Sequence, residues 1–261
     1  MRTSILIALV ALCSVSHAQL LPWTTLHPPA LGHAISATYF DVGPRPVRHV
    51  VYLTDGGKWA SETSIAARLR KLHAQHPDYP PTRYVLIGTI DSAANVDHRQ
   101  HLFGCDNDEL HEAFAKTLIP WAEDSTGRAF TSSDRTLIGL SLGGAHAATE
   151  LARDDALFGN FVLLSPITYA CPDLARRVAF LSAAFERSEE ACLELVEQAK
   201  TRRAYLSTGR LDAETYAEPL DALLRGAGVE TEFVQTEGDH DFANWDAQWD
   251  SVLAWLHEAG L

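Results

Sequence analysis

A serine flanked by two glycines is the feature of this sequence that most directly predicts nucleophilic chemistry. The segment Gly139-Leu140-Ser141-Leu142-Gly143 has the spacing Gly-x-Ser-x-Gly, follows the apolar run 136–138 and opens a helical pattern. In such a strand–turn–helix segment the serine lies on a strained turn, and its neighbours two positions away must lack side chains. The spacing predicts a nucleophilic Ser141, with the backbone N–H of Leu142 placed to stabilise an oxyanion. A glycine-rich turn without chemistry is the alternative.

A serine hydroxyl is a weak nucleophile, so a histidine is needed to accept its proton. Among the 12 histidines, His240 has the expected order and setting, because it follows a predicted strand and precedes the last predicted helix. His146 and His257 lie within predicted helices, where packing and surface exposure are the simpler interpretations. We therefore predict that His240 is the general base.

The carboxylate that orients the imidazole should lie between the serine and the histidine in the sequence. Asp212 follows a predicted strand and is the first candidate, and Glu214 in the same loop is the second. Asp212 could instead act only as the N-cap of the following helix. The order Ser141, Asp212, His240 differs from that of chymotrypsin-like and subtilisin-like proteases.

A second oxyanion donor is expected in the loop after an early strand. The segment Asp55-Gly56-Gly57-Lys58-Trp59 follows the apolar run Val50–Thr54, and paired glycines let backbone N–H groups approach a ligand closely. Gly57 is the first candidate donor and Lys58 the second, while a plain turn is the alternative. The side chains of Lys58 and Trp59 are candidate substrate contacts.

The elements that must position these residues alternate between strand and helix patterns. Several strand candidates are continuous apolar runs, as expected for strands buried on both faces of a sheet. The alternation predicts an α/β fold with a mostly parallel central sheet and helices on both faces, in one domain over residues 19–261. The helical interval 166–203 is a candidate cap. The predicted strands are Ile35–Phe40, Val47–Thr54, Tyr84–Ile90, Arg135–Gly139, Phe161–Ser165, Ala204–Ser207 and Thr231–Gln235, and the predicted helices are Ser61–Ala74, Glu109–Glu123, Leu142–Arg153, Leu181–Lys200, Ala213–Gly226 and Trp245–Ala259.

The first 18 residues have the layout of a secretory signal peptide, with one basic residue, an apolar run and small residues before Ala18. We therefore expect cleavage after Ala18 and a periplasmic or secreted protein. No later stretch reaches the length of a transmembrane helix. In an oxidising compartment Cys171 and Cys192 are the candidate disulfide pair, which would leave Cys105 free.

The net charge and the potential metal ligands indicate which binding partners to expect. The 261 residues carry a formal net charge of −13, and such an acidic surface argues against binding to nucleic acid. Five potential metal ligands gather in one segment, but their spacing matches no common zinc pattern. We expect no metal and no cofactor, and a small-molecule ester as the substrate; the oligomeric state stays open. The five ligands are His98, His101, Cys105, Asp106 and His111.

Four segments together resemble the α/β-hydrolase fold and, more narrowly, the "putative esterase" group that includes enterochelin (enterobactin) esterases and their periplasmic relatives. They are VVYLTDGGKWASE (50–62), YVLIGTIDSAANVDHRQHL (84–102), DRTLIGLSLGGAHA (134–147) and EGDHDFANW (237–245). The resemblance implies a serine carboxylic-ester hydrolase with a siderophore trilactone or similar aryl-bearing ester as substrate, and the helical interval 166–203 would form its small helical cap.

The resemblance also implies that Arg99 lines the substrate site, where a guanidinium could bind a catecholate or carboxylate. A surface arginine in a charged loop is the alternative. The family often has Arg-x-x-Glu-Leu here, whereas this chain reads Arg99-Gln100-His101-Leu102, which leaves the siderophore substrate open. An acyltransferase or general aryl or short-acyl esterase with the same triad, and a non-catalytic siderophore-binding protein, are the other candidate functions.

Overall fold

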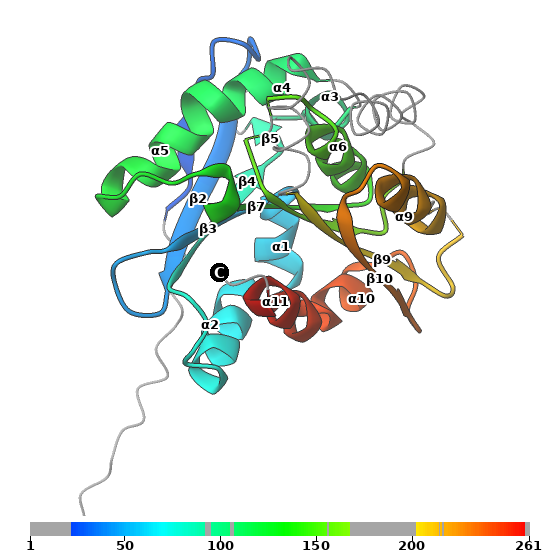
Figure 1. Cartoon of the computed structure of the whole chain (residues 1–261). Coiled ribbons are helices and arrows are strands. Elements are labelled where there is room, and N and C mark those ends of the chain that lie inside the picture. The colour runs from blue at the N-terminus through cyan, green and yellow to red at the C-terminus, as the bar shows by residue number, and fades with distance from the viewer. Residues whose placement is uncertain are drawn as a thin grey trace, which may run out of the picture.

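The structure is a computed structural model that describes residues 22–91, 95–104, 107–155, 157–167, 202–213, 215 and 217–258 (Figure 1). Its centre is an eight-stranded sheet with the strand order β1-β2-β4-β3-β7-β8-β9-β10. Within this sheet β4, β3, β7, β8, β9 and β10 run parallel to one another, and β2 and β1 add an antiparallel edge beside β4. The bounds are β1 Thr24–Leu26, β2 Ile35–Val42, β3 His49–Leu53, β4 Thr82–Gly88, β7 Arg135–Leu140, β8 Asn160–Leu164, β9 Arg203–Gly209 and β10 Glu230–Thr236.

The central strands are buried from end to end. Every residue of β3, β4 and β8 is buried, because helices cover both faces of a parallel sheet. The seven predicted strands are all present, with ends shifted by two residues at most. The sequence did not predict β1 or the small antiparallel hairpin of β5 (Ile90–Asp91) and β6 (Val96–Asp97).

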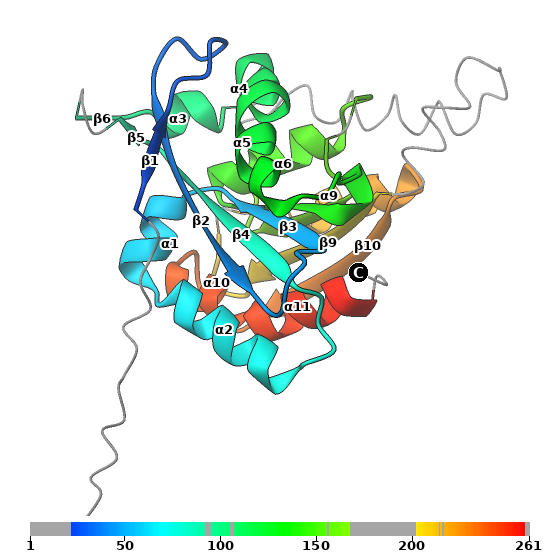
Figure 2. The ribbon, with the colours of Figure 1, turned by 90° about the vertical axis from the view of Figure 1, so that its left-hand side faces the viewer.

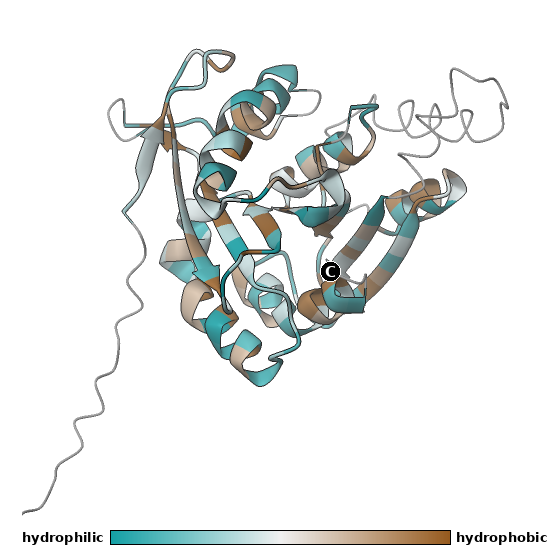
Figure 3. Ribbon diagram, turned by 60° about the vertical axis from the view of Figure 1, so that its left-hand side comes forward, coloured by the Kyte–Doolittle hydropathy of each residue, from teal (hydrophilic) through white to brown (hydrophobic). Residues whose placement is uncertain are grey.

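Helices cover the two faces of the sheet in separate layers (Figure 2). Hydrophobic and hydrophilic residues are mixed along them (Figure 3), as in amphipathic helices packed on a sheet. One core cluster lies under α4, α5, α6 and α9, and the other lies under α1, α2, α10 and α11. The bounds are α1 Gly56–Glu62, α2 Ile65–Gln75, α3 Arg99–Leu102, α4 Asp108–Ala113, α5 Ile119–Glu123, α6 Leu142–Leu151, α9 Ala217–Gly226, α10 Phe242–Ala247 and α11 Trp249–Glu258, with a π-helical turn at Phe114–Leu118 and 3-10 turns at Asp124–Thr126 and Ser132–Asp134.

Three predicted helices are each divided in the structure. The helix predicted over Glu109–Glu123 is divided into α4, the π-helical turn at Phe114–Leu118 and α5. The helix predicted over Ser61–Ala74 separates into α1 and α2 at Thr63, whose backbone is extended (φ −129°) and whose hydroxyl donates to the Trp59 carbonyl at 2.7 Å. The helix predicted over Trp245–Ala259 begins earlier, at Phe242, because Asp241 is an N-cap that accepts from the Asn244 N–H. It then divides into α10 and α11 at Gln248.

Several expectations concern parts of the chain outside the described residues. These are the signal peptide over residues 1–18, nearly all of the candidate cap over 166–203 and all four cysteines, so the disulfide pairing stays a prediction. Within the described ranges, no helix has both the length and the apolar character needed to cross a membrane.

Candidate active site

The candidate active site lies at the carboxyl edge of the sheet, where three parallel strands end. Ser141 follows β7, Asp212 follows β9 within three residues, and His240 follows β10 within four. Ligands bind at this edge of open α/β sheets, because the loops that leave parallel strands converge there. His240 is thereby brought into contact with Ser141, which lies 99 positions away in the sequence, and with Asp212, which lies 28 positions away.

The turn around Ser141 has the strained geometry of a nucleophile elbow. Ser141 has φ 55° and ψ −118°, a conformation that residues with side chains rarely adopt. A Cβ on Gly139 would overlap the Gly143 carbonyl, and a Cβ on Gly143 would overlap the Thr54 hydroxyl. The Ser141 N–H donates to the Leu164 carbonyl of β8 at 2.9 Å. The two glycines are therefore required for the close packing of β7, α6 and β3.

A continuous chain of polar contacts joins the three predicted side chains. His240 Nε2 lies 2.9 Å from Ser141 Oγ, and His240 Nδ1 lies 2.9 Å from Asp212 Oδ2. The Asp212 carboxylate is fully buried and the His240 side chain is 17% exposed. An imidazole protonated on Nδ1 donates to Asp212 and accepts the Ser141 hydroxyl proton on Nε2. Glu214, the second candidate acid, lies outside the described residues.

The loop that carries His240 is held by Asn244. The Asn244 side chain donates to the Asp239 carbonyl at 2.9 Å and accepts from the Thr236 hydroxyl at 2.7 Å. Gly238 lies so close to Asn244 that a Cβ would stand 2.5 Å from the amide carbon. Asn244 lies within the EGDHDFANW segment, but the spacing of residues in the sequence does not predict such a bond.

The two predicted oxyanion donors lie at the starts of two helices. Leu142 is the first residue of α6 and Gly57 the second of α1, and the first N–H groups of a helix have no partner within it. The helices follow β7 and β3, which are neighbours in the sheet. A Cβ on Gly57 would meet nothing within 4 Å. Both helix starts thus lie at the edge that carries Ser141.

Arg99 lies against a buried carboxylate at this edge. Its Nε is 2.5 Å from Asp55 Oδ1 and its Nη2 is 3.3 Å from Asp55 Oδ2. Asp55 is 2% exposed and has φ 55°. Burial raises the pKa of the Asp55 carboxyl, and the Arg99 guanidinium opposes that rise. The charge of Arg99 is therefore largely compensated, whereas the Lys58 side chain is exposed.

The structure corrects the prediction for Trp59. We expected this side chain to contact substrate, but it is fully buried in the core beneath the sheet. Its ring packs edge-on against Phe242 at 5.2 Å and Trp249 at 5.6 Å between centroids. On the short helix α1 the indole faces the core, so it has no surface to offer a ligand.

The histidines of the segment 98–111 contact side chains from other parts of the chain. The His98 ring stacks on His33 at 3.8 Å between centroids, and the His111 Nδ1 lies 2.8 Å from the Glu150 carboxylate. Cys105 and Asp106 lie outside the described residues. Among the residues that the structure does describe, no group of three or more potential ligands is arranged to hold a metal ion.

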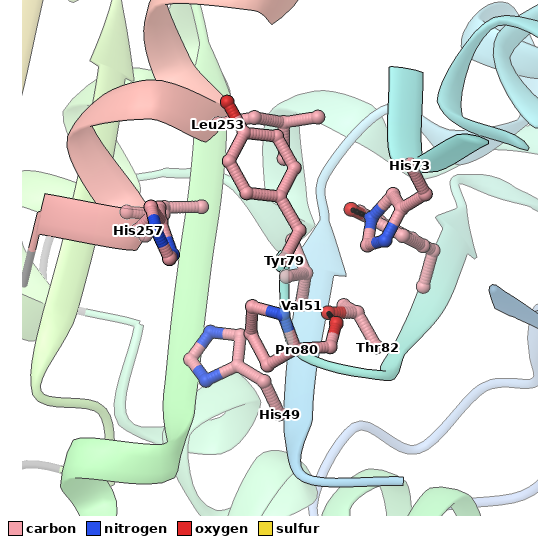
Figure 4. A pocket seen from close by; sticks show the side chains of 10 residues that line it. His49, Val51, His73, Tyr79, Pro80, Thr82, Leu253 and His257 are labelled. Carbon is pink, nitrogen blue, oxygen red and sulfur yellow. Dashed lines mark hydrogen bonds between the residues drawn. The ribbon is translucent and has the colours of Figure 1, made fainter. Parts of the chain in front are cut away.

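A small cavity lies at the opposite edge of the sheet (Figure 4). It has a volume of about 20 Å³, which is room for a single water molecule. His49, at the start of β3, and His73 line it together with His257. Because β3 and β7 are parallel, this edge is remote from Ser141, and the cavity forms no part of the candidate active site.

Comparison with solved structures shows the same fold in several esterases. The enterobactin esterase of Shigella flexneri, in the presence of enterobactin, is 22% identical with a TM-score of 0.71, over 92% of this chain and 60% of that one. A ferulic acid esterase is 17% identical with a TM-score of 0.68, over 91% and 97% of the two chains. S-formylglutathione hydrolase from Staphylococcus aureus is 17% identical with a TM-score of 0.57, over 90% and 95%.

This chain thus spans about 60% of the length of the enterobactin esterases that it resembles. No curated protein matches it. The family model described as "Putative esterase" matches residues 43–256, a range that includes the Ser141 turn, Asp212 and His240. With the mostly parallel sheet and its two helical layers, this match shows that the chain belongs to the esterase family of the α/β-hydrolase fold.

Proposed function

We propose that this protein is a serine carboxylic-ester hydrolase in which Ser141 is the nucleophile, His240 the general base and Asp212 the carboxylate that orients the imidazole. The observation that carries the proposal is the contact chain from Ser141 Oγ through His240 to Asp212, with 2.9 Å at each step. A buried carboxylate on Nδ1 leaves Nε2 free to accept the serine proton. Membership of an esterase family supports the choice of an ester as substrate.

In the proposed reaction the Ser141 oxygen bonds to the ester carbonyl carbon while its proton passes to His240 Nε2. The carbonyl oxygen becomes an oxyanion that accepts from the N–H groups of Leu142 and Gly57. The carbon–oxygen bond to the alcohol then breaks, and the imidazolium returns the proton to that alcohol. Water attacks the acyl-serine by the same path, and its proton passes through His240 back to the Ser141 oxygen as the acid leaves.

The proposed substrate is an aryl-bearing ester, with a siderophore trilactone of the enterobactin type as the leading candidate. Enterobactin and ferulic acid esterases are among the structures with this fold. The exposed Lys58, near the predicted donor Gly57, could attract an anionic ligand. Arg99 contributes less, because Asp55 already compensates its charge.

Hydrolysis of a p-nitrophenyl ester tests the proposed activity. Wild type should release p-nitrophenol, and Ser141→Ala should not, while Ser251→Ala, at an exposed serine of α11, should behave as wild type. Equal rates for wild type and Ser141→Ala would end the proposal. A fluorophosphonate probe that fails to label wild type at Ser141 would favour a binding protein.

The substrate itself needs a turnover screen of the purified protein against trilactone, aryl and short-acyl esters. Preference for the trilactone would support the siderophore assignment, and preference for short acyl chains would identify a general esterase. Product analysis with added acceptor alcohols would reveal acyl transfer.

We also propose that the first 18 residues direct the protein to the periplasm or the secreted space. The basic start, apolar run and small residues before Ala18 support this. Mass analysis of the exported protein should find a chain that begins at Gln19. A full-length chain retained inside the cell would contradict this localisation.

A further inference from the structure

The indole of Trp245 lies between His240 and the end of strand β8. It is 4% exposed, and its Nε1–H donates to the Ser165 hydroxyl at 3.1 Å. The His240 and Trp245 rings are nearly perpendicular, at 82°, with centroids 5.1 Å apart. The indole therefore contacts the proposed base on one side and is tied to a neighbouring strand by its one polar atom.

The same strand end also holds the proposed nucleophile. Leu164, the last residue of β8, accepts the Ser141 N–H at 2.9 Å, and the next residue, Ser165, accepts the Trp245 indole. The Ser165 N–H in turn donates to the Ser207 carbonyl of β9 at 2.9 Å. Two consecutive residues thus connect the base and the nucleophile to one rigid element, and β9, to which Ser165 is bonded, leads to Asp212.

Ser165 occupies a backbone conformation that favours glycine. Its φ is 48°, and a non-glycine residue is held in this region only at a cost in backbone strain. The residue is fully buried, so its hydroxyl is not used at the surface. The hydroxyl accepts the indole N–H, which is the contact that glycine could not make. A strained serine at this position is explained by a requirement for that bond.

Aromatic packing also restrains the indole. Phe242 contacts Trp245 edge-on at 5.1 Å between centroids, and Trp59 contacts Phe242 edge-on at 5.2 Å. Trp249 continues the series into the core at 5.6 Å from Trp59. The buried Trp59 therefore belongs to the packing that backs the His240 loop, and rotation of the indole would disturb the whole series.

We propose that Trp245 and Ser165 are positioning residues that hold the His240 imidazole at proton-transfer distance from Ser141. The inference rests on the proposed function and adds two residues to it. General base catalysis depends on a hydrogen bond of about 2.6–3.2 Å between base and nucleophile. A misplacement of about 1 Å can lower the rate by about a hundredfold. A ring fixed by one hydrogen bond and by edge-on packing limits such displacement.

The test compares two tryptophan variants. Trp245→Phe keeps an aromatic ring but removes the indole N–H. Trp255→Phe is the matched control, since Trp255 is also 4% exposed and lies in the same core cluster but contacts Tyr205 and Arg203 instead. For p-nitrophenyl ester hydrolysis we expect Trp245→Phe to lower kcat about tenfold with KM unchanged, as for loss of an arrangement used in the transition state. Trp255→Phe should leave kcat within about twofold of wild type.

Ser165→Gly tests the same bond from its other end. Glycine suits φ 48°, so the melting temperature should change little while kcat falls about as far as in Trp245→Phe. If both variants remove one bond, the double variant should lose no more activity than either single variant. The single variant Ser165→Gly also keeps the inference testable if Trp245→Phe fails to fold.

The outcomes separate this inference from the proposed function. A wild type that is not labelled at Ser141 by a fluorophosphonate ends the proposed function and this inference with it. A labelled wild type, together with equal kcat for Trp245→Phe and Trp255→Phe, overturns only the positioning role. The positioning role is also overturned if the losses of Trp245→Phe and Ser165→Gly multiply, or if only KM changes.

Discussion

Arg99, the first residue of α3, and Asp55, the N-cap of α1, form a two-point ion pair beside the turn that carries the proposed nucleophile. The guanidinium contacts both carboxylate oxygens, at 2.5 and 3.3 Å. One of those oxygens would stand 3.1 Å from a Cβ placed on Gly143. The pair is therefore packed against the Ser141 turn, and Asp55 is buried while Arg99 is 21% exposed. Its first role is to neutralise a buried carboxylate.

Loss of Arg99 should destabilise the fold, and the effect should depend on pH. Arg99→Gln leaves Asp55 buried without its partner, which should cost about 3 kcal/mol of unfolding free energy at pH 7. Burial already raises the pKa of Asp55, and Arg99 opposes that rise, so the variant should raise it further. The penalty applies to the ionised carboxylate and should shrink as pH falls and Asp55 takes up a proton.

Urea unfolding of wild type and Arg99→Gln at pH 7 and pH 5 measures this difference. Arg68→Gln is a matched control, because Arg68 pairs with Asp246 and Asp250 at the surface and should contribute less than about 1 kcal/mol. If the difference in unfolding free energy between wild type and Arg99→Gln is the same at pH 7 and pH 5, this prediction is wrong.

The identity of the third residue of the proposed triad can be decided by two amide substitutions. Asp212→Asn should lower kcat by roughly 10⁴-fold, because an amide at this position favours the wrong imidazole tautomer. Glu214→Gln should change kcat by less than about twofold. Steady-state ester hydrolysis measures both variants. If Glu214→Gln gave the large loss and Asp212→Asn did not, Asp212 would be a structural partner only.

The close packing of the Ser141 turn predicts a large effect from one methyl group. Gly143→Ala would place its Cβ against the Thr54 side chain, and overpacking of this kind costs about 1–3 kcal/mol. The turn would shift, so ester hydrolysis should fall with stability. Gly226→Ala, where a Cβ meets nothing within 4 Å, should keep full activity. Thermal unfolding and ester turnover of Gly143→Ala and Gly226→Ala measure this difference. Equal melting temperatures and equal turnover for the two variants would contradict the prediction.

Two buried histidines should make stability fall in acid. Burial lowers the pKa of His49 and of His73 from 6.5 to about 4. Between these values the unfolded chain binds protons that the folded protein does not, so stability is lost as pH falls from 6.5 towards 4. Each histidine can account for about 3 kcal/mol at the acid end of that window.

Chemical denaturation between pH 4 and pH 8 measures this loss. His49→Asn should flatten the fall, while His27→Asn, at an exposed position, should leave it unchanged. Equal slopes for wild type and His49→Asn would show that burial of His49 does not set the acid limit.

Local requirements made much of this protein predictable from sequence. The strands and most helices follow from periodicity, since the pattern of apolar residues is read within a few positions. The Ser141 turn follows from its two glycines, because the backbone that it needs excludes side chains locally. The order of Ser141, Asp212 and His240 predicted partners that the structure indeed places in contact, because each follows a parallel strand.

Contacts between distant segments were decided only by the tertiary structure. Trp59 was expected at the substrate site, but the packing of α1 on the sheet turned it into the core. The ion pair of Arg99 with Asp55, and the bond from Trp245 to Ser165, join residues 44 and 80 positions apart. The sequence offers no spacing rule for such pairs, since they depend on strand order and on how loops pack where parallel strands end.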